Sequence, residues 1–321
     1  MTNDNRIMGI DETKRELDSL REKASPDVEK LAHAEVARCI FTEKPTIRFK
    51  DVAGMDEVKQ AIQKYIPFDL QGAKDDRQLN VPPGGGILLY GPPGNGKTFI
   101  VEAIAGEMNA PIFFPGAFFK SRYVGETGKN MRALFEEAAK HDRAVIFFDN
   151  VEMFLGRRSN KTVNMIGEFL VCADGISEHK NDILIMGTTS IPWLLDDTVL
   201  RKLFVNQIYV GMPNSETARK IFEQQFDGVP HEDDFSFDEF VKRLVGKKKI
   251  FSSRDIKQIC RAVKKRAIAH MIDNNVDSPV ILKEYVLSAI DAMMPTISQD
   301  SIEKCRLWRN LQTEYEEQNN D

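Results

Sequence analysis

A glycine-rich segment with one lysine and one threonine is the strongest chemical signal in the sequence. In GGGILLYGPPGNGKTF, the residues Gly91, Gly96, Lys97 and Thr98 satisfy the pattern G-x-x-x-x-G-K-[ST]. Such a loop turns its backbone N–H groups toward phosphates, its lysine reaches the β- and γ-phosphates, and its hydroxyl binds Mg²⁺. GILLY before the loop predicts a strand, and TFIVEAIAGEM after it predicts a helix whose N-terminus favours an anion. The segment therefore predicts binding of a nucleoside triphosphate with magnesium.

An apolar run that ends in a carboxylate is the second signal. In AVIFFDNVEMF, Val145 to Phe148 lead directly into Asp149, as in a buried parallel strand whose acidic end faces a metal ion. A nucleotide-hydrolysing enzyme would carry a second carboxylate next to activate water, but here the next residue is Asn150. An amide can orient water and cannot take its proton, so the segment predicts weak hydrolysis.

The arrangement of apolar runs predicts the fold class that positions these residues. From about residue 46 to 211, short Val-, Ile- and Phe-rich runs alternate with helix-length patterns, which predicts an α/β fold with a doubly wound parallel sheet. From Pro213 onward four helical patterns follow, and an amphipathic stretch comes after Pro295. We expect an N-terminal helical segment or linker at 1–44, a large α/β nucleotide-binding domain at 45–212, a small helical lid domain at 213–295 and a C-terminal helix at 296–321.

Composition and charge argue against several functional classes. A net charge of -5 argues against general binding to nucleic acid or to anionic membranes. The 4 cysteines lie far apart without a CxxC pair, so neither a zinc site nor a disulfide framework is indicated. No apolar run approaches the roughly 20 residues of a membrane span, and the N-terminus has no signal-peptide pattern. We expect a cytoplasmic or nuclear protein.

Six segments together resemble the AAA ATPases in their order and spacing. They are FKDVAGMDEVKQAI, GGGILLYGPPGNGKT, KSRYVGETGKNMRALFEEA, AVIFFDNVEMF, GTTSIPWLLD and FSSRDIKQI. The most similar members are the group of katanin, spastin and the ESCRT-disassembling ATPase, and the D2-type module of the segregase unfoldases. The resemblance covers about residues 47 to 295 and extends to the C-terminal helix, whereas residues 1–44 show no such resemblance. It implies a P-loop AAA module that binds ATP and Mg²⁺.

The resemblance also implies which residues bind the nucleotide. Thr98 and Asp149 would hold Mg²⁺. Arg254 in FSSRDI resembles a second-sensor arginine that reaches the phosphates, although it could instead pair with Asp255 or Asp238. The remaining positions are an adenine-binding segment, Asp51, Val52, Ala53 and Gly54, and a phosphate-binding segment, Pro93, Gly94, Asn95, Gly96, Lys97, Thr98 and Phe99.

The sequence departs from the family at positions that act in hydrolysis. Family members carry glutamate where this chain has Asn150, and they usually carry asparagine at the first sensor, where this chain has Ser190. In the arginine-finger stretch Arg201 can serve as one finger, Lys202 is a weaker substitute, and Leu203 stands near the second. The elements that bind nucleotide are intact, whereas those that cleave it are altered.

The resemblance places Arg122, Tyr123 and Val124 at the first pore loop, where an aromatic from each subunit of a hexamer contacts a translocating polypeptide. Tyr123 could also pack locally. We therefore expect a hexameric ring, of this chain alone or with other subunits, that remodels a protein client while hydrolysing ATP slowly. One alternative is a pseudo-ATPase subunit that binds ATP without turnover. Another is a cytoskeleton-severing enzyme whose Arg122, Arg157 and Arg158 bind acidic tails.

Overall fold

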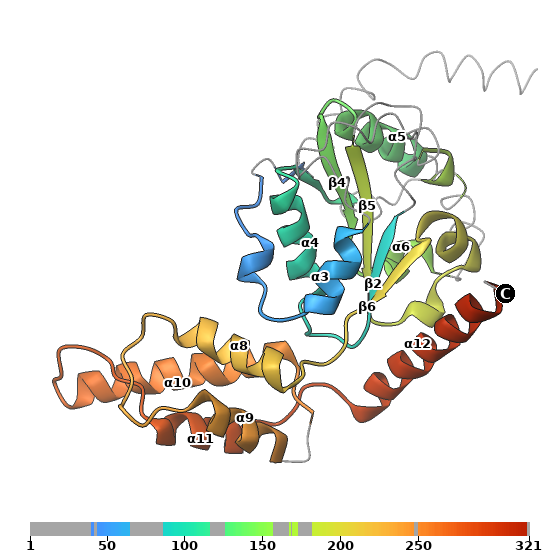
Figure 1. The fold of residues 1–321 in the computed structure, drawn as a ribbon. Coiled ribbons are helices and arrows are strands. Elements are labelled where there is room, and N and C mark those ends of the chain that lie inside the picture. Colours follow the sequence, from blue (N-terminus) through green and yellow to red (C-terminus); the bar gives the residue numbers. More distant parts are fainter. Residues whose placement is uncertain are drawn as a thin grey trace, which may run out of the picture.

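A mostly parallel β-sheet forms the centre of the computed structural model (Figure 1). The structure describes residues 40–41, 44–64, 86–115, 126–156, 167, 169–172, 182–246 and 250–319. Strand β1 pairs antiparallel with β3, and all other neighbours in the order β1-β3-β4-β5-β2-β6 are parallel. The strands are β1 Ile40–Phe41, β2 Ile87–Tyr90, β3 Ile112–Phe113, β4 Arg143–Phe148, β5 Asp182–Thr189 and β6 Asn206–Tyr209. The predicted α/β fold class is confirmed.

Helices cover both faces of the sheet, which explains why its strands are apolar throughout. In β4, Val145 and Phe147 face a core shared with α3 (Asp56–Gln63) and α4 (Lys97–Glu107). The alternate residues, Ile146 and Phe148, face a second core shared with α5 (Glu126–Ala138) and α6 (Glu152–Leu155). All four side chains are buried, so each strand stabilises two layers of helices.

The N-terminal edge of the sheet corrects one sequence prediction. We expected an N-terminal helical segment or linker at 1–44, with a helical pattern that includes Ile40 and Phe41, but these two residues form β1. They pair with Phe113 and Ile112 of β3. This long-range pairing overrides the local helical pattern, because it satisfies backbone groups at the edge of the sheet. Residues 1–39 lie outside the part of the chain that the structure describes.

Four helices form a separate group with its own core (Figure 1). They are α8 Ser215–Phe226, α9 Phe237–Gly246, α10 Ser253–Asp273 and α11 Lys283–Ala292. Phe222 and Phe240 are fully buried at the centre of this core. Helix α10 begins with a capping box, in which the Ser252 hydroxyl accepts from the Asp255 N–H and the Asp255 carboxylate accepts from the Ser252 N–H. The four helices predicted from the sequence are confirmed.

The C-terminal helix α12 (Gln299–Asn319) returns from the helical group to the sheet (Figure 1). The Cys305 thiol donates to the Ser190 carbonyl at 3.5 Å, just after β5. The Arg309 guanidinium lies 5.0 Å from the centre of the Tyr209 ring on β6. Helix α12 thus packs directly behind a predicted site residue. Within the described ranges, no helix combines the length and hydropathy needed to cross a bilayer.

Candidate nucleotide-binding site

Three neighbouring strands deliver the predicted site residues to one edge of the sheet. The phosphate loop follows β2, Asp149 follows β4, and Ser190 follows β5. The strands are adjacent and parallel, and their ends are level because Tyr90 pairs with Thr189 and Phe148 pairs with Gly187. Carboxyl ends of parallel strands are where this class of fold binds ligands.

The glycines of the loop permit a backbone path that other residues resist. Gly96 has a φ of 83° and ends the loop immediately before α4. At Gly91, with a φ of 145°, a Cβ atom would lie 2.2 Å from the Val210 carbonyl oxygen. Both positions exclude a side chain, one by conformation and the other by space as well. The loop therefore keeps its backbone close to the sheet and leads into the N-terminus of α4.

Lys97 is a buried cation at the floor of the site. Its Nζ atom donates to the carbonyl oxygens of Gly91 at 2.8 Å and Pro92 at 2.9 Å, and to the Ser190 hydroxyl at 3.1 Å. Burial lowers the pKa of Lys97 to about 8, and the negative charge of the Asp149 carboxylate offsets only part of this effect. A phosphate group would restore the solvation that the ammonium group lacks.

Nucleotide affinity is expected to decrease as pH rises above about 8. The empty protein loses the Lys97 proton near that pH, whereas phosphate binds the charged form. Affinity should change little below about pH 7.5. Above pH 8 it should fall by about tenfold per pH unit, because on the order of one proton is taken up on binding. Titration with a fluorescent nucleotide between pH 7 and 9.5 measures this. Constant affinity to pH 9.5 would contradict a role for the Lys97 charge.

Oxygen atoms suited to magnesium lie together beside the loop. The Thr98 hydroxyl donates to Asp149 Oδ1 at 3.2 Å, and the Thr188 hydroxyl donates to the same oxygen at 2.5 Å. Hydroxyl and carboxylate oxygens are the ligands that Mg²⁺ prefers. Thr98 follows β2 and Asp149 follows β4, on either side of β5, and both residues line the cavity, so the donor set fits this ion.

Asn150 lies in the same cavity, next to Asp149. Its backbone has a φ of 54°, in the left-handed region that asparagine adopts more readily than most residues. The Asn150 N–H donates to the Thr188 hydroxyl at 3.3 Å, and the Val151 N–H donates to the Thr188 carbonyl at 2.9 Å. Strand β5 therefore fixes the backbone of Asn150, whose side-chain amide can hold water but cannot accept a proton.

The cavity lies between the phosphate loop and the first two turns of α10. It has a volume of about 550 Å³. Its lining consists of Pro93, Gly94, Gly96, Lys97, Thr98, Phe99, Asp149, Asn150, Thr188, Ser190, Ser253, Arg254, Lys257, Gln258 and Arg261. The loop, the sensor position and a face of the helical group thus enclose one space large enough for a small-molecule ligand.

Arg254 lies at the cavity wall. Its N–H donates to the Gly94 carbonyl at 2.9 Å, so the start of α10 contacts the phosphate loop directly. Both carboxylates that the sequence offered as other partners have hydrogen bonds elsewhere. Asp255 accepts from the Thr296 hydroxyl at 2.7 Å, and Asp238 accepts from Arg219 at 3.0 Å.

Asn95 connects the phosphate loop to the helical group through a hydrogen bond. It is fully buried, and its Oδ1 atom accepts from the Ser253 N–H at 3.3 Å. Its Nδ2 atom donates to the Pro92 carbonyl at 3.4 Å and lies 3.1 Å from the Met212 sulfur. Asn95 does not line the cavity, so the structure places it as a support of the loop.

The predicted adenine-binding segment lies beside the loop and against α8. The described residues that line the cavity do not include Asp51, Val52, Ala53 or Gly54. Ala53 packs on the core of the helical group, and a Cβ atom at Gly54 would lie 2.3 Å from the Thr217 hydroxyl of α8. Asp51 caps the short helix η1 (Phe49–Asp51), where its carboxylate accepts from the Arg48 N–H.

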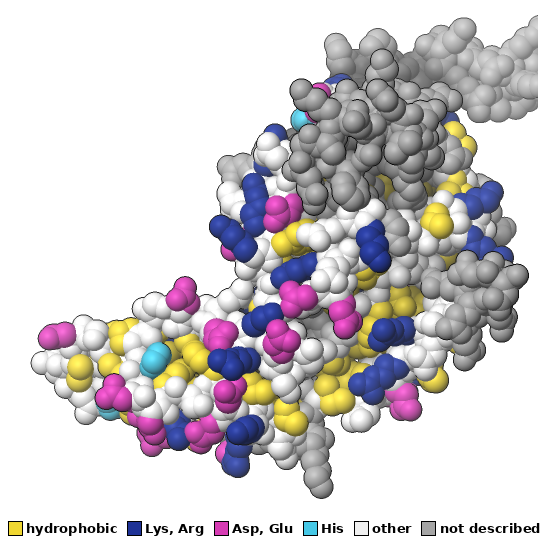
Figure 2. All heavy atoms as spheres, viewed as in Figure 1, with side chains coloured by type: hydrophobic (Ala, Val, Ile, Leu, Met, Phe, Trp, Pro, Cys, Tyr) yellow, Lys and Arg dark blue, Asp and Glu magenta, His cyan; other side chains and the backbone are white. Residues whose placement is uncertain are grey.

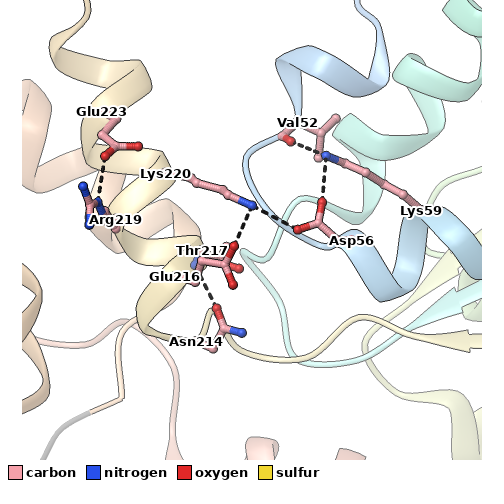
Figure 3. Close-up of polar contacts among 9 residues, drawn as sticks. All are labelled: Val52, Asp56, Lys59, Asn214, Glu216, Thr217, Arg219, Lys220 and Glu223. Atoms are coloured by element: carbon pink, nitrogen blue, oxygen red, sulfur yellow. Dashed lines mark hydrogen bonds and ion pairs between the residues drawn. The ribbon is translucent and has the colours of Figure 1, made fainter.

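Figure 3 shows the polar contacts that hold this segment to α8. The Lys220 ammonium lies 3.0 Å from the Asp56 carboxylate and 2.8 Å from Glu216. Lys59 donates to the Val52 carbonyl at 2.7 Å. Lys220 lowers the pKa of Asp56. The pair is exposed, so it orients the segment more than it stabilises the fold. An adenine role for these residues stays a prediction.

The residues predicted to act in hydrolysis or in the pore loop do not all lie at the cavity. Ser190 lines the cavity and contacts Lys97. Arg201 is exposed on the π-helix η6 (Val199–Leu203), and the described lining of the cavity does not include it. Leu203 is buried in the core, where a finger could not extend to a neighbour. Arg122, Tyr123 and Val124 lie outside the described residues, as do Arg157 and Arg158.

Sequence reasoning missed five residues of the cavity. Two are Thr188 and Ser253, and the other three are Lys257, Gln258 and Arg261 of α10. A signal for these three existed, because they follow Arg254 by three, four and seven positions and so share its face of the helix. That spacing was visible in SRDIKQICR, but only the contact between α10 and the loop shows that this face meets the site.

Comparison with known proteins identifies the family. Residues 87–212 match the family described as ATPase family associated with various cellular activities (AAA). The chain is 29% identical over 283 residues to the Cell division cycle protein 48 homolog of Archaeoglobus fulgidus, covering 83% of this chain and 38% of the relative. It is 32% identical over 246 residues to Vacuolar protein sorting-associated protein 4A of Homo sapiens, covering 74% and 54%.

A third relative is Spastin of Xenopus tropicalis, 40% identical over 184 residues, covering 56% of this chain and 30% of the relative. The chain thus spans between 30% and 54% of the length of these three relatives. The matched residues 87–212 begin at β2 and contain the phosphate loop, Asp149 and Ser190. The chain therefore contains a domain of the AAA ATPase family.

Proposed function

We propose that this chain binds ATP with magnesium in the cavity between the phosphate loop and α10, and that it hydrolyses ATP slowly. The observation that carries the proposal is the set of groups lining that cavity. Lys97, Thr98 and Asp149 are placed as a triphosphate and its metal ion require, whereas the position beside Asp149 holds the amide of Asn150. Groups suited to phosphate and magnesium thus share one cavity, and the residue beside Asp149 cannot accept a proton from water.

The chemistry follows from what each side chain can do. Lys97 would exchange its bonds to the Gly91 and Pro92 carbonyls for phosphate oxygens. Thr98 and Asp149 would hold Mg²⁺, which supplies positive charge to the phosphates. Asn150 and Ser190 would orient the attacking water through hydrogen bonds. A general base typically contributes about 10²–10⁴-fold, so a site without one turns over slowly.

We propose that the chain acts in a ring and remodels a protein client. The family membership supports this, and Tyr123 is the residue we propose to contact the client. The ring contains this chain alone or together with other subunits. A protein client also suits the charge pattern, since Lys and Arg are interspersed with Asp and Glu on the described face in Figure 2. The net charge of -5 does not favour nucleic acid.

Turnover and assembly of the purified protein test this proposal together. Phosphate release should be measurable and on the order of 0.001–0.1 s⁻¹, since a median enzyme near 10 s⁻¹ loses about 10²–10⁴-fold without its base. Light scattering should show a larger assembly when ATP and Mg²⁺ are present. If phosphate release is undetectable but assembly depends on ATP, the protein is a pseudo-ATPase subunit and not a slow ATPase. Release near 10 s⁻¹ would contradict both.

A further inference from the structure

Helix α10 presents a row of cations to the cavity. Arg254, Lys257 and Arg261 all belong to the cavity lining, and their spacing of three and four residues places them on one helix face. Gln258 lies between them on the same face. All of these side chains are exposed, so the described structure leaves their charged ends accessible to a ligand.

Several contacts hold this face against the phosphate loop. The Arg254 N–H donates to the Gly94 carbonyl at 2.9 Å, and the Ser253 N–H donates to Asn95 at 3.3 Å. One turn farther along, the Lys257 ammonium lies 4.8 Å from the centre of the Phe99 ring on α4. This distance permits a cation–π interaction, which holds the lysine over the helix that follows the loop. These contacts therefore orient the row of cations toward the site.

The charges around the cavity are unbalanced. Among the described residues, its lining includes four cations, Lys97, Arg254, Lys257 and Arg261, but only one carboxylate, Asp149. Like charges around a shared space repel one another, and the proximity of Arg254 contributes to the lowered pKa of Lys97. A ligand with several negative charges relieves this repulsion, and the gain increases with the charge of the ligand.

We infer that Lys257 and Arg261 determine specificity for ATP over ADP, by attracting the more highly charged nucleotide from the α10 side. This inference rests on the proposed ATP-binding function and extends it, because it assigns discrimination to residues of the same chain as the phosphate loop. The finger stretch contributes less than in a two-arginine arrangement, since Lys202 is a point charge and Leu203 is buried.

The test compares ATP and ADP binding in a variant with both distal cations removed. With Mg²⁺ present for both nucleotides, the Kd for ATP should rise about tenfold in Lys257→Ala/Arg261→Ala, while the Kd for ADP should rise about threefold or less. Competition against a fluorescent nucleotide measures both constants. The ATP affinity of the wild-type chain should also fall more steeply than that of the variant between roughly 50 and 300 mM salt.

Two further variants separate charge from structure. Lys265→Ala removes an exposed cation one turn beyond Arg261 that does not line the cavity, and it should change both constants by less than about twofold. Lys257→Arg/Arg261→Lys keeps both charges and should restore the preference for ATP. Unfolding temperatures should agree between all variants without nucleotide, because the substituted side chains are exposed.

An unchanged ratio of the ATP and ADP constants in Lys257→Ala/Arg261→Ala overturns the inference, whether both constants rise equally or neither moves. In those cases the wild-type chain still binds ATP, so the proposed function survives. A wild-type chain that binds neither nucleotide contradicts the proposed function itself. The two failures are therefore distinguishable in one set of titrations.

Discussion

Phosphate release is expected to increase about 10²-fold or more when Asn150 is replaced by glutamate. The substitution supplies a carboxylate that can accept the proton of the attacking water. The surrounding groups are already placed, since Asn150 shares its cavity with Lys97, Thr98 and Asp149. Its backbone is fixed by the bond from its N–H to the Thr188 hydroxyl, so the new carboxylate would start from a defined position. A coupled phosphate assay at saturating ATP measures the rate.

Asn150→Gln is the matched control for this prediction. Glutamine has the length of glutamate but, like asparagine, cannot take a proton, so it should not accelerate release. Both variants place a longer side chain at a φ of 54°, which costs about 1–2 kcal/mol, and both should unfold at a somewhat lower temperature. If Asn150→Glu is no faster than the wild-type chain, the missing base does not limit the reaction.

The sequence predicted the sheet, the helical group and the phosphate loop because each leaves a local pattern. Helices cover both faces of β4, so the side chains of Val145 to Phe148 are apolar whichever face they point to. That continuous apolar run identifies a buried parallel strand. The loop pattern is equally local, because Gly91 and Gly96 are required by conformation and space that only glycine tolerates.

Long-range contacts could not be predicted in the same way. Ile40 and Phe41 form a strand because β3 offers them an unpaired edge, and nothing in their immediate neighbourhood indicates this. Similarly, the spacing of Arg254, Lys257 and Arg261 predicts a shared helix face but not what that face meets. The contact between α10 and Gly94 decides it, and that contact depends on how two separate cores dock.

Lys97→Ala is expected to weaken ATP binding at least about 100-fold, which corresponds to about 2.7 kcal/mol. Charge-assisted hydrogen bonds contribute roughly 1.5–3 kcal/mol each, and the ammonium group can make more than one to the phosphates. Burial makes the loss larger than at a surface site, because little water can replace the missing cation. Fluorescent-nucleotide titration gives the affinity, and ATP should raise the unfolding temperature of the wild-type chain only.

Lys140→Ala is the control, since this exposed lysine pairs with Glu137 at the C-terminal end of α5 and does not line the cavity. It should leave ATP affinity within about twofold of the wild-type value, as exposed ion pairs contribute little.

The variant Lys97→Arg separates charge from geometry. Arginine stays protonated throughout the accessible pH range, so whatever affinity it retains should lack the decrease above pH 8 that the pKa of Lys97 predicts. Unaltered ATP binding in Lys97→Ala would show that the nucleotide does not rest on this loop.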